Sequence, residues 1–281
     1  MLIKNLIDKN KKILIIGAHP DDVEFSTGRL MLKRKGENTH VVVLTDGRKG
    51  QINNIEISEK EYAIIRIKES IRALQKLGIK NENRYFLGYQ DQELTFQSFA
   101  INKIKKIIQK IQPDYILVHP YEGAHPDHDA AHVFTYIAAK KAKYSLNNII
   151  EYSSYNHFGG KYNLQEFIPK ETREIILNPT KKEQTKWSTI MREFKSQKTL
   201  QKIEIPKSKF EKYRKLPNYN YTKLPYSSTF CLIIRHLISP IYSIAKIILP
   251  KKDKLFYERW SKIDPLIIHR RIKSIVEVET N

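Results

Sequence analysis

Two clusters of histidine and aspartate contain the residues best suited to chemistry in this sequence. They are Ala18-His19-Pro20-Asp21-Asp22-Val23-Glu24 and His125-Pro126-Asp127-His128-Asp129. A catalytic zinc ion takes three protein ligands with nitrogen or oxygen donors and keeps one position open for water. His19 and Asp22 lie three positions apart on a predicted turn into a helix, so they can chelate an ion from one side. His128, from a distant loop, is the candidate third ligand.

The other members of the clusters have the chemistry that amide hydrolysis needs. Zinc polarises an amide carbonyl and lowers the pKa of bound water toward about 7. Asp21, beside the ligands, can accept the proton of that water as a general base. His125 can stabilise the developing oxyanion and then protonate the departing amine. Asp127 can hold His125 in one tautomer and favour its charged form. This ligand set suits Zn²⁺ and also admits Fe²⁺.

A single His-Pro-Asp tripeptide would indicate no more than a turn, because proline and aspartate favour turns. Here two such tripeptides each follow a predicted strand, and each is crowded with further metal-binding side chains. This pattern favours a metal centre over two ordinary loops. His119 ends another predicted strand and fits a core position as well as a place in the site.

The elements that must position these clusters alternate regularly from residue 12 to about 153. Short apolar runs predict buried strands at 13–16, 41–44, 84–87, 115–118 and 149–153, with helices between them. Ser58 and Glu61 form a capping box that predicts a helix start, and Gly36 suits the end of an earlier helix. Such alternation predicts an α/β, Rossmann-like three-layer sandwich with a mainly parallel sheet. Ligands of such sheets bind at the carboxyl ends of strands, where both clusters lie.

The two clusters resemble the signature motifs of the PIG-L (LmbE-like) N-deacetylase family. The second match is the longer run Tyr121-Glu122-Gly123-Ala124-His125-Pro126-Asp127-His128-Asp129-Ala130-Ala131, and similar segments include Leu44-Thr45-Asp46-Gly47, Arg66 to Glu69, Leu87-Gly88-Tyr89-Gln90-Asp91 and Lys195-Ser196-Gln197. The resemblance covers about residues 11–200. It implies zinc-dependent hydrolysis of N-acetylglucosaminyl groups in a Rossmann-like fold.

The resemblance also implies residue roles. His19, Asp22 and His128 would be metal ligands, Asp21 the base, and His125 with Asp127 the electrophilic pair, while Arg66 and Asp91 match sugar contacts of relatives. Arg48 stands where many relatives carry an acidic residue, and Ser26-Thr27 replaces a stretch rich in glycine, which leaves the substrate open. His157, in the segment 152–160, is a further candidate substrate contact, although an ordinary hairpin fits that segment equally well.

The charge balance favours an anionic partner. The 281 residues include 50 Lys and Arg against 30 Asp and Glu, a net charge of +20. Nucleic acid, anionic lipid and phosphorylated substrates are partners of such proteins, but lysine-rich coding explains the excess equally well. No known nucleic-acid-binding motif is present, so nucleic acid is not expected. A single cysteine, Cys231, and a start without a secretory apolar core predict a cytoplasmic location.

The chain is expected to divide near residue 200 into a catalytic domain, 1–200, and a basic and apolar extension, 201–281. Segment 229–249 is long enough to span a membrane, but Arg235, His236 and Pro240 near its middle argue against spanning. It fits a helix on the protein's own core, or one lying on the inner face of the membrane.

The sequence therefore predicts a metal-dependent hydrolase that removes the N-acetyl group from a GlcNAc-type sugar in a glycoconjugate or glycolipid precursor. The aglycone is expected to be anionic or lipid-linked, with a nucleotide- or inositol-linked sugar as the rival. A non-catalytic member that binds sugars or anionic ligands is the alternative. A dinucleotide-binding oxidoreductase is disfavoured, because Gly17 is followed by His-Pro-Asp-Asp rather than by a G-x-G-x-x-G motif.

Overall fold

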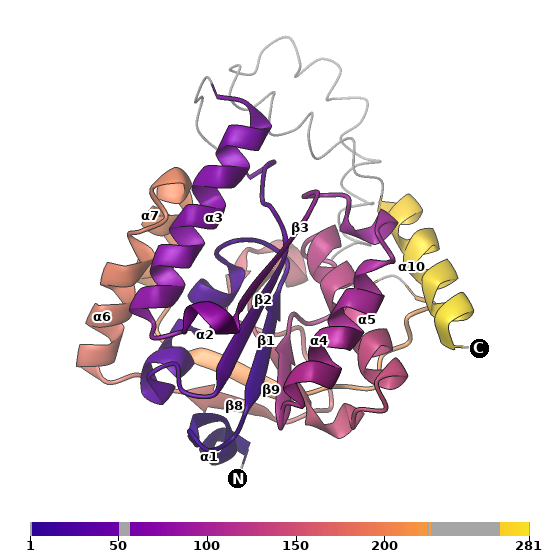
Figure 1. Cartoon of the computed structure of the whole chain (residues 1–281), viewed down its shortest axis with the longest axis horizontal. Helices are drawn as coiled ribbons and strands as arrows, with labels where there is room; N and C mark the ends of the chain where they lie inside the picture. The colour runs from indigo at the N-terminus through magenta and orange to yellow at the C-terminus, as the bar shows by residue number, and fades with distance from the viewer. Residues whose placement is uncertain (1, 51–56, 224, 226–264, 281) are drawn as a thin grey trace.

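The computed structural model describes residues 2–50, 57–223, 225 and 265–280. A seven-stranded sheet in the order β3-β2-β1-β4-β5-β9-β8 lies between helices on both faces (Figure 1). The strands are β1 (Ile13–Gly17), β2 (Thr39–Thr45), β3 (Arg84–Tyr89), β4 (Tyr115–Val118), β5 (Ile149–Tyr152), β8 (Glu174–Leu177) and β9 (Glu211–Lys215). Strands β1 to β5 pair in parallel, and β9 pairs antiparallel with β5 and β8. This architecture confirms the predicted α/β fold.

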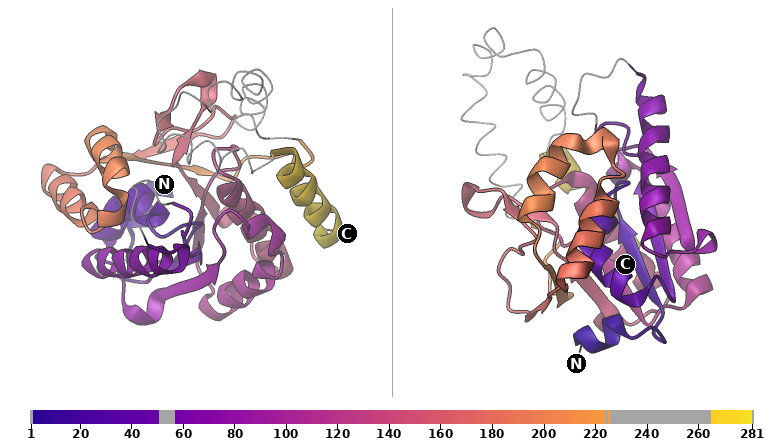
Figure 2. Two further views of the ribbon diagram at one scale, coloured as in Figure 1. Left: turned by 90° about the horizontal axis from the view of Figure 1, so that it is seen from above. Right: turned by 90° about the vertical axis from the view of Figure 1, so that its left-hand side faces the viewer.

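Two layers of helices cover the sheet (Figure 2). One layer has α4 (Ala100–Ile111), α5 (Pro126–Lys141) and α10 (Pro265–Thr280), and the other has α1 (Leu2–Ile7), α2 (Asp22–Arg34), α3 (Glu59–Lys76) and α6 (Lys181–Met191). Helix α7 (Lys198–Lys207) follows α6, and β6 (Tyr155–Asn156) pairs with β7 (Asn163–Leu164) in a small hairpin. Short 3₁₀ segments are η1 (Asn81–Asn83), η2 (Leu94–Phe96), η3 (Leu146–Asn148), η4 (Phe158–Gly160) and η5 (Lys195–Gln197).

The first strand shows why the apolar runs of the sequence become central strands. Successive side chains of a strand point to opposite faces. Leu14 and Ile16 of β1 pack in the core under α4 and α5, and Ile13 and Ile15 pack in the core under α2. Because both faces are covered, every position of the strand is apolar and buried, as a parallel sheet requires.

Two helix ends follow the predicted local signals. Ser58 and Glu61 form the capping box that starts α3, with each side chain bonded to the backbone N–H of the other. Gly36 follows α2 with φ of 70°, and an added Cβ there would lie 2.0 Å from the carbonyl oxygen of Gly78. The loops that follow α2 and α3 therefore meet at a point where only glycine fits.

The helical segment over residues 181–207 is interrupted in the structure. Helix α6 ends at Met191 and α7 starts at Lys198, with η5 between them. Ser196 donates from its N–H and its hydroxyl to the Glu69 carboxylate, over 3.0 and 2.5 Å. These buried contacts with α3 hold a turn that local helical periodicity does not reveal.

Strand β9 lies beyond residue 200, in the region expected to form a basic and apolar extension. Arg214 of β9 is fully buried, and its guanidinium donates to Glu151 over 2.6 Å and to Glu122 over 3.0 Å. The lysines and the arginine of this strand are residue types that usually face solvent. In the structure, Glu151 and Glu122, which are 63 and 92 positions away in the chain, neutralise Arg214. We propose that the catalytic unit continues through β9 rather than ending near residue 200.

Replacing Arg214 by methionine is expected to destabilise the fold by about 3–5 kcal/mol, because it leaves two buried carboxylates without their cation. Chemical denaturation of the full chain measures this free energy of unfolding. Lys215→Met, at the exposed neighbouring position, is the control and is expected to change stability by less than about 0.5 kcal/mol. Equal stabilities of the two variants would contradict the assignment of β9 to the core sheet.

None of the helices within the described residues is both long and apolar enough to cross a membrane. Segment 229–249 lies outside the described residues, so its contact with the protein core or with a membrane stays a prediction.

Candidate metal centre

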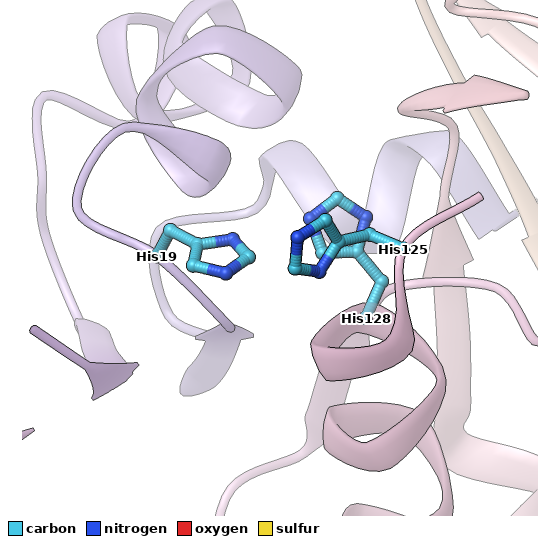
Figure 3. Close-up of side chains that lie close together, drawn as sticks. All are labelled: His19, His125 and His128. Atoms are coloured by element: carbon cyan, nitrogen blue, oxygen red, sulfur yellow. The ribbon is translucent and has the colours of Figure 1, made fainter. Parts of the chain in front are cut away.

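The two histidine clusters meet at one edge of the sheet. His19 follows β1, and His125 and His128 lie at the start of α5, after β4. Strands β1 and β4 are parallel neighbours, so their carboxyl ends bring the two loops together at the point where the strand order reverses. Figure 3 shows the three imidazoles facing one another. Their ring centroids are 4.6 Å apart for His19 and His125 and 5.3 Å apart for His19 and His128.

The carboxylate of Asp22 lies between two of these imidazoles. Its Oδ2 is 3.2 Å from His19 Nδ1, and its Oδ1 is 3.3 Å from His128 Nε2. The three side chains are each no more than 10% exposed. Ligand atoms bound to zinc at about 2.1 Å and at tetrahedral angles lie about 3.4 Å from one another. The two contacts of Asp22 have this spacing, so Asp22 can share an ion with His19 or with His128.

The sequence places His119 equally well in the core or in the site. In the structure it belongs to this cluster. Its Nε2 lies 3.1 Å from Asp22 Oδ2, and its ring stacks on His128 with centroids 3.9 Å apart. His132 donates from Nδ1 to the His119 carbonyl oxygen over 2.8 Å. Among the described residues, Asp22, His119 and His128 are close enough to form a set of metal ligands. Two other such sets are His19 with His125 and His128, and His19 with Asp91 and Asp127. None of the three sets contains all three predicted ligands, so their sharing of one ion stays a prediction.

The electrostatics of His128 and Asp22 favour metal binding. Burial lowers the pKa of His128 to about 3, with nearby His119 adding to the effect, so its ring is neutral as a ligand must be. Burial also acts on Asp22, but His128, His119 and His19 outweigh it and hold the pKa of this carboxyl well below its usual range. A neutral imidazole beside an ionised carboxylate is the state that binds zinc.

The other nitrogen of His19 faces two carboxylates. Its Nε2 lies 3.1 Å from Asp91 Oδ1 and 3.3 Å from Asp127 Oδ2. Burial opposes charge on His19, but Asp91 and Asp22 outweigh it and raise the pKa of the imidazole. Carboxylates on one nitrogen of a histidine fix its tautomer and leave the other nitrogen for a metal. The structure thus places Asp91 and Asp127 against His19, and their predicted roles toward sugar and toward His125 stay predictions.

The predicted base, Asp21, has a strained backbone with φ of 146°. Its Oδ2 accepts a hydrogen bond of 2.5 Å from Arg66. Burial raises the pKa of Asp21 to about 6, against the opposing effect of Arg66 and with the help of the Asp22 charge. A carboxyl group with a pKa near the working pH is well suited to act as a general base.

Arg66, predicted to contact sugar, is buried and points at the base. It also donates to the carbonyl oxygens of Pro20, over 3.0 Å, and Gly47, over 2.9 Å. Gly47 has φ of 65°, and a Cβ there would lie 2.6 Å from the Arg66 guanidinium. Arg66 therefore holds the loop and carboxylate of Asp21, while its contact with a sugar stays a prediction.

The remaining predicted residue, His157, lies in the β6–β7 hairpin, outside the cluster. Its ring contacts those of Tyr155 and Tyr162, with centroids 6.2 and 5.8 Å apart. Tyr155 in turn packs against His128, with centroids 5.5 Å apart. The hairpin thus reaches the metal cluster through Tyr155, whose role no motif of the sequence signals.

Helix α7 brings one further acidic group to the site. Glu204 is 8% exposed and lines a cavity together with Asp21 and Asp22. Burial raises the pKa of Glu204 to about 8, and the charge of Asp21 adds to the effect. Nothing in the sequence around Glu204 distinguishes it from the other charged residues of that region.

Part of the chain is similar in sequence to known deacetylases. Residues 14–139 match the PIG-L family model, described as GlcNAc-PI de-N-acetylase. Diacetylchitobiose deacetylase of Thermococcus kodakarensis is 36% identical over 124 residues, covering 42% of this chain and 45% of that protein. Probable N-acetyl-alpha-D-glucosaminyl L-malate deacetylase 2 of Bacillus cereus is 32% identical over 127 residues, covering 43% and 57%. The chain therefore spans about half the length of these curated relatives.

Solved structures share the fold. N,N'-diacetylchitobiose deacetylase of Pyrococcus horikoshii superposes with a TM-score of 0.52 at 23% identity, covering 78% of this chain and 88% of that one. This likeness shows a common arrangement of sheet and helices.

Proposed function

The chain belongs to the PIG-L family, and from this membership and its site we propose that it is a metal-dependent hydrolase that removes the N-acetyl group from an amino sugar of the GlcNAc type. One observation supports this proposal above all. The Asp22 carboxylate lies at ligand spacing between His19 and His128, which come from loops more than 100 residues apart. Asp21, a carboxylate suited to proton transfer, lies next to it in the chain.

The proposed metal ligands are His19, Asp22 and His128. Zn²⁺ is the ion that their nitrogen and oxygen donors favour, and Fe²⁺ suits them as well. When bound, such an ion polarises the amide carbonyl and acidifies water. His19 would bind through Nδ1, because its Nε2 faces the carboxylates of Asp91 and Asp127.

The chain's own residues supply the proton transfers. Asp21 accepts the proton of the water that attacks the amide carbon, while Arg66 holds the carboxylate in position. Nδ1 of His125 accepts the backbone N–H of Asp127 over 3.2 Å, so the proton of the neutral ring is on Nε2. Burial and the charge of His19 lower the pKa of His125 to about 3, which keeps the ring neutral. We assign this N–H to a hydrogen bond with the developing oxyanion, and the proton that Asp21 takes from water to the departing amine.

Arg66→Gln is expected to shift the acid limb of the pH–rate profile to higher pH. The guanidinium stabilises the charged form of Asp21, so its loss raises the pKa of the base, which is about 6 with Arg66 in place. The rate, kcat/KM, then falls at a pH where the wild-type enzyme is still active. An acid limb at the same pH in both proteins would contradict the assignment of Arg66 to the base.

The proposed substrate carries its sugar on an anionic or lipid group. The net charge of +20 supports an anionic aglycone, which the protein would meet in the cytoplasm or at the inner face of a membrane. The two curated relatives act, by their names, on diacetylchitobiose and on a GlcNAc-malate conjugate. Flotation with anionic vesicles, comparing the full chain with a chain that ends near residue 228, tests the contribution of the C-terminal segment to membrane binding.

A panel of N-acetylated sugars tests the reaction itself. The full chain is incubated with N,N'-diacetylchitobiose, GlcNAc-inositol, GlcNAc-malate and lipid-linked GlcNAc, with and without a chelator. At least one is expected to release acetate and free amine in equal amounts, and the chelator should stop the release. Binding of a sugar without release of acetate would favour the alternative of a non-catalytic binding protein.

A further inference from the structure

A cavity adjoins the metal centre on the side of the β6–β7 hairpin and α7. It measures about 50 Å³, and Asp21 and Asp22 form part of its wall. A space of this size admits a few groups the size of a water molecule, so it can take one arm of a sugar but not a whole ring. The cavity is therefore placed to receive a substituent of the molecule whose amide lies at the metal centre.

Glu204 supplies this cavity with a carboxyl group that the proposed reaction does not use. Its Oε1 accepts a hydrogen bond of 3.0 Å from the Tyr162 hydroxyl. No lysine, arginine or histidine of the described chain forms an ion pair with it. Because Glu204 lines the cavity, its second oxygen, Oε2, can form a hydrogen bond with a ligand there.

Gln165 gives a second, independent indication of a ligand. This residue lines the same cavity and is 4% exposed. Its Nε2 is 3.4 Å from the Phe25 carbonyl oxygen, while its Oε1 is buried without a hydrogen-bond partner. Buried polar atoms are almost always bonded, so Oε1 of Gln165 is an unused acceptor beside Glu204 at the same cavity.

The remaining wall is apolar or weakly polar. Aromatic rings come from Phe25 and Tyr155, and an aliphatic side chain comes from Leu164. The Tyr155 and Tyr162 rings lie almost parallel, with centroids 5.6 Å apart and planes 26° apart. A few convergent acceptors on an apolar wall characterise a binding site for a small neutral group. A sugar hydroxyl at the end of a carbon arm suits such a wall. The hydroxyl forms a hydrogen bond, and the carbon of the arm contacts the apolar side chains.

We propose that the cavity is a subsite for a hydroxyl-bearing arm of the sugar, and that Glu204, held by Tyr162, is the specificity-determining hydrogen-bond partner of that hydroxyl. The inference rests on the proposed deacetylation, because it places the sugar amide at the metal centre. Glu204 binds ground state and transition state alike, since the hydroxyl is remote from the breaking C–N bond. Its loss should therefore raise KM and leave kcat unchanged.

The test compares wild type, Glu204→Ala and Tyr162→Phe with N-acetylglucosamine, N,N'-diacetylchitobiose and the 3-, 4- and 6-deoxy forms of N-acetylglucosamine. Calorimetry gives Kd, and acetate release gives KM and kcat. Glu204→Ala is expected to weaken binding at least about tenfold, the effect of losing one hydrogen bond to a carboxyl group. Lys202→Ala, at an exposed position of α7, is the matched control and should bind like wild type.

The deoxy sugars can be compared with the wild-type protein alone, so the test remains valid if a variant fails to fold. Wild type should bind one of them about tenfold more weakly than N-acetylglucosamine, and Glu204→Ala should not distinguish the two. Equal affinity of wild type for every sugar, or no binding of any, would overturn the subsite. Binding that follows this pattern without release of acetate would support the subsite and contradict the proposed deacetylation. Failure of the subsite and failure of the proposed reaction therefore give different results.

Discussion

Asp21→Asn is expected to lower turnover on the order of 10²–10⁴-fold while the protein keeps its metal. Asparagine preserves the shape of the side chain and a hydrogen bond to Arg66, but it cannot accept the proton of the attacking water. Because the proposed ligands are His19, Asp22 and His128, the ion does not depend on this carboxylate. Acetate release gives the rate, and elemental analysis of the dialysed protein gives the metal content.

The neighbouring residue provides the matched control. Asp22→Asn removes the charge that lies between two imidazoles, so it should lose both metal and turnover. Glu37→Gln, in an ion pair with Lys9 at the surface, should change neither. An Asp21→Asn enzyme with the wild-type rate would show that another group accepts the proton.

His128→Ala is expected to reduce metal affinity by more than about 100-fold and to abolish turnover. Loss of a group that merely orients a ligand costs about 10–100-fold in affinity, and His128 is a proposed ligand itself. Its Nε2 is 3.3 Å from Asp22, and alanine leaves no donor at this position. Titration of the apo protein with zinc and a competing chelator measures the affinity.

His40→Ala serves as the control, because His40 lies near the start of β2, which places it at the opposite edge of the sheet from the site. It should bind zinc like wild type. A His128→Ala protein with unchanged zinc affinity would show that His119, stacked on His128, replaces it or that the ion binds elsewhere.

The central part of the fold could be predicted because local patterns determine it. The apolar runs of β1 and β4 are buried on both faces, and the capping box of Ser58 starts α3 where the sequence indicates. The topology then requires both histidine clusters to meet at one sheet edge. Spacing within the motifs thus suffices to bring His19 and His128 together.

Contacts between distant segments could not be predicted in this way. Strand β9 is charged in sequence and buried in the fold, because Arg214 is neutralised by Glu122 and Glu151. The two carboxylates at His19 Nε2 come from separate segments, the loop after β3 and the first turn of α5, and their side-chain orientation is set by packing. Glu204 reaches the site only because η5 separates α6 from α7.

Diffraction from crystals of the zinc-loaded protein, recorded on both sides of the zinc absorption edge, tests the central claim most directly. The account predicts one strong anomalous peak within about 2.0–2.2 Å of His19 Nδ1, an Asp22 oxygen and His128 Nε2. A protein that takes up zinc but shows no peak between these three side chains would contradict it.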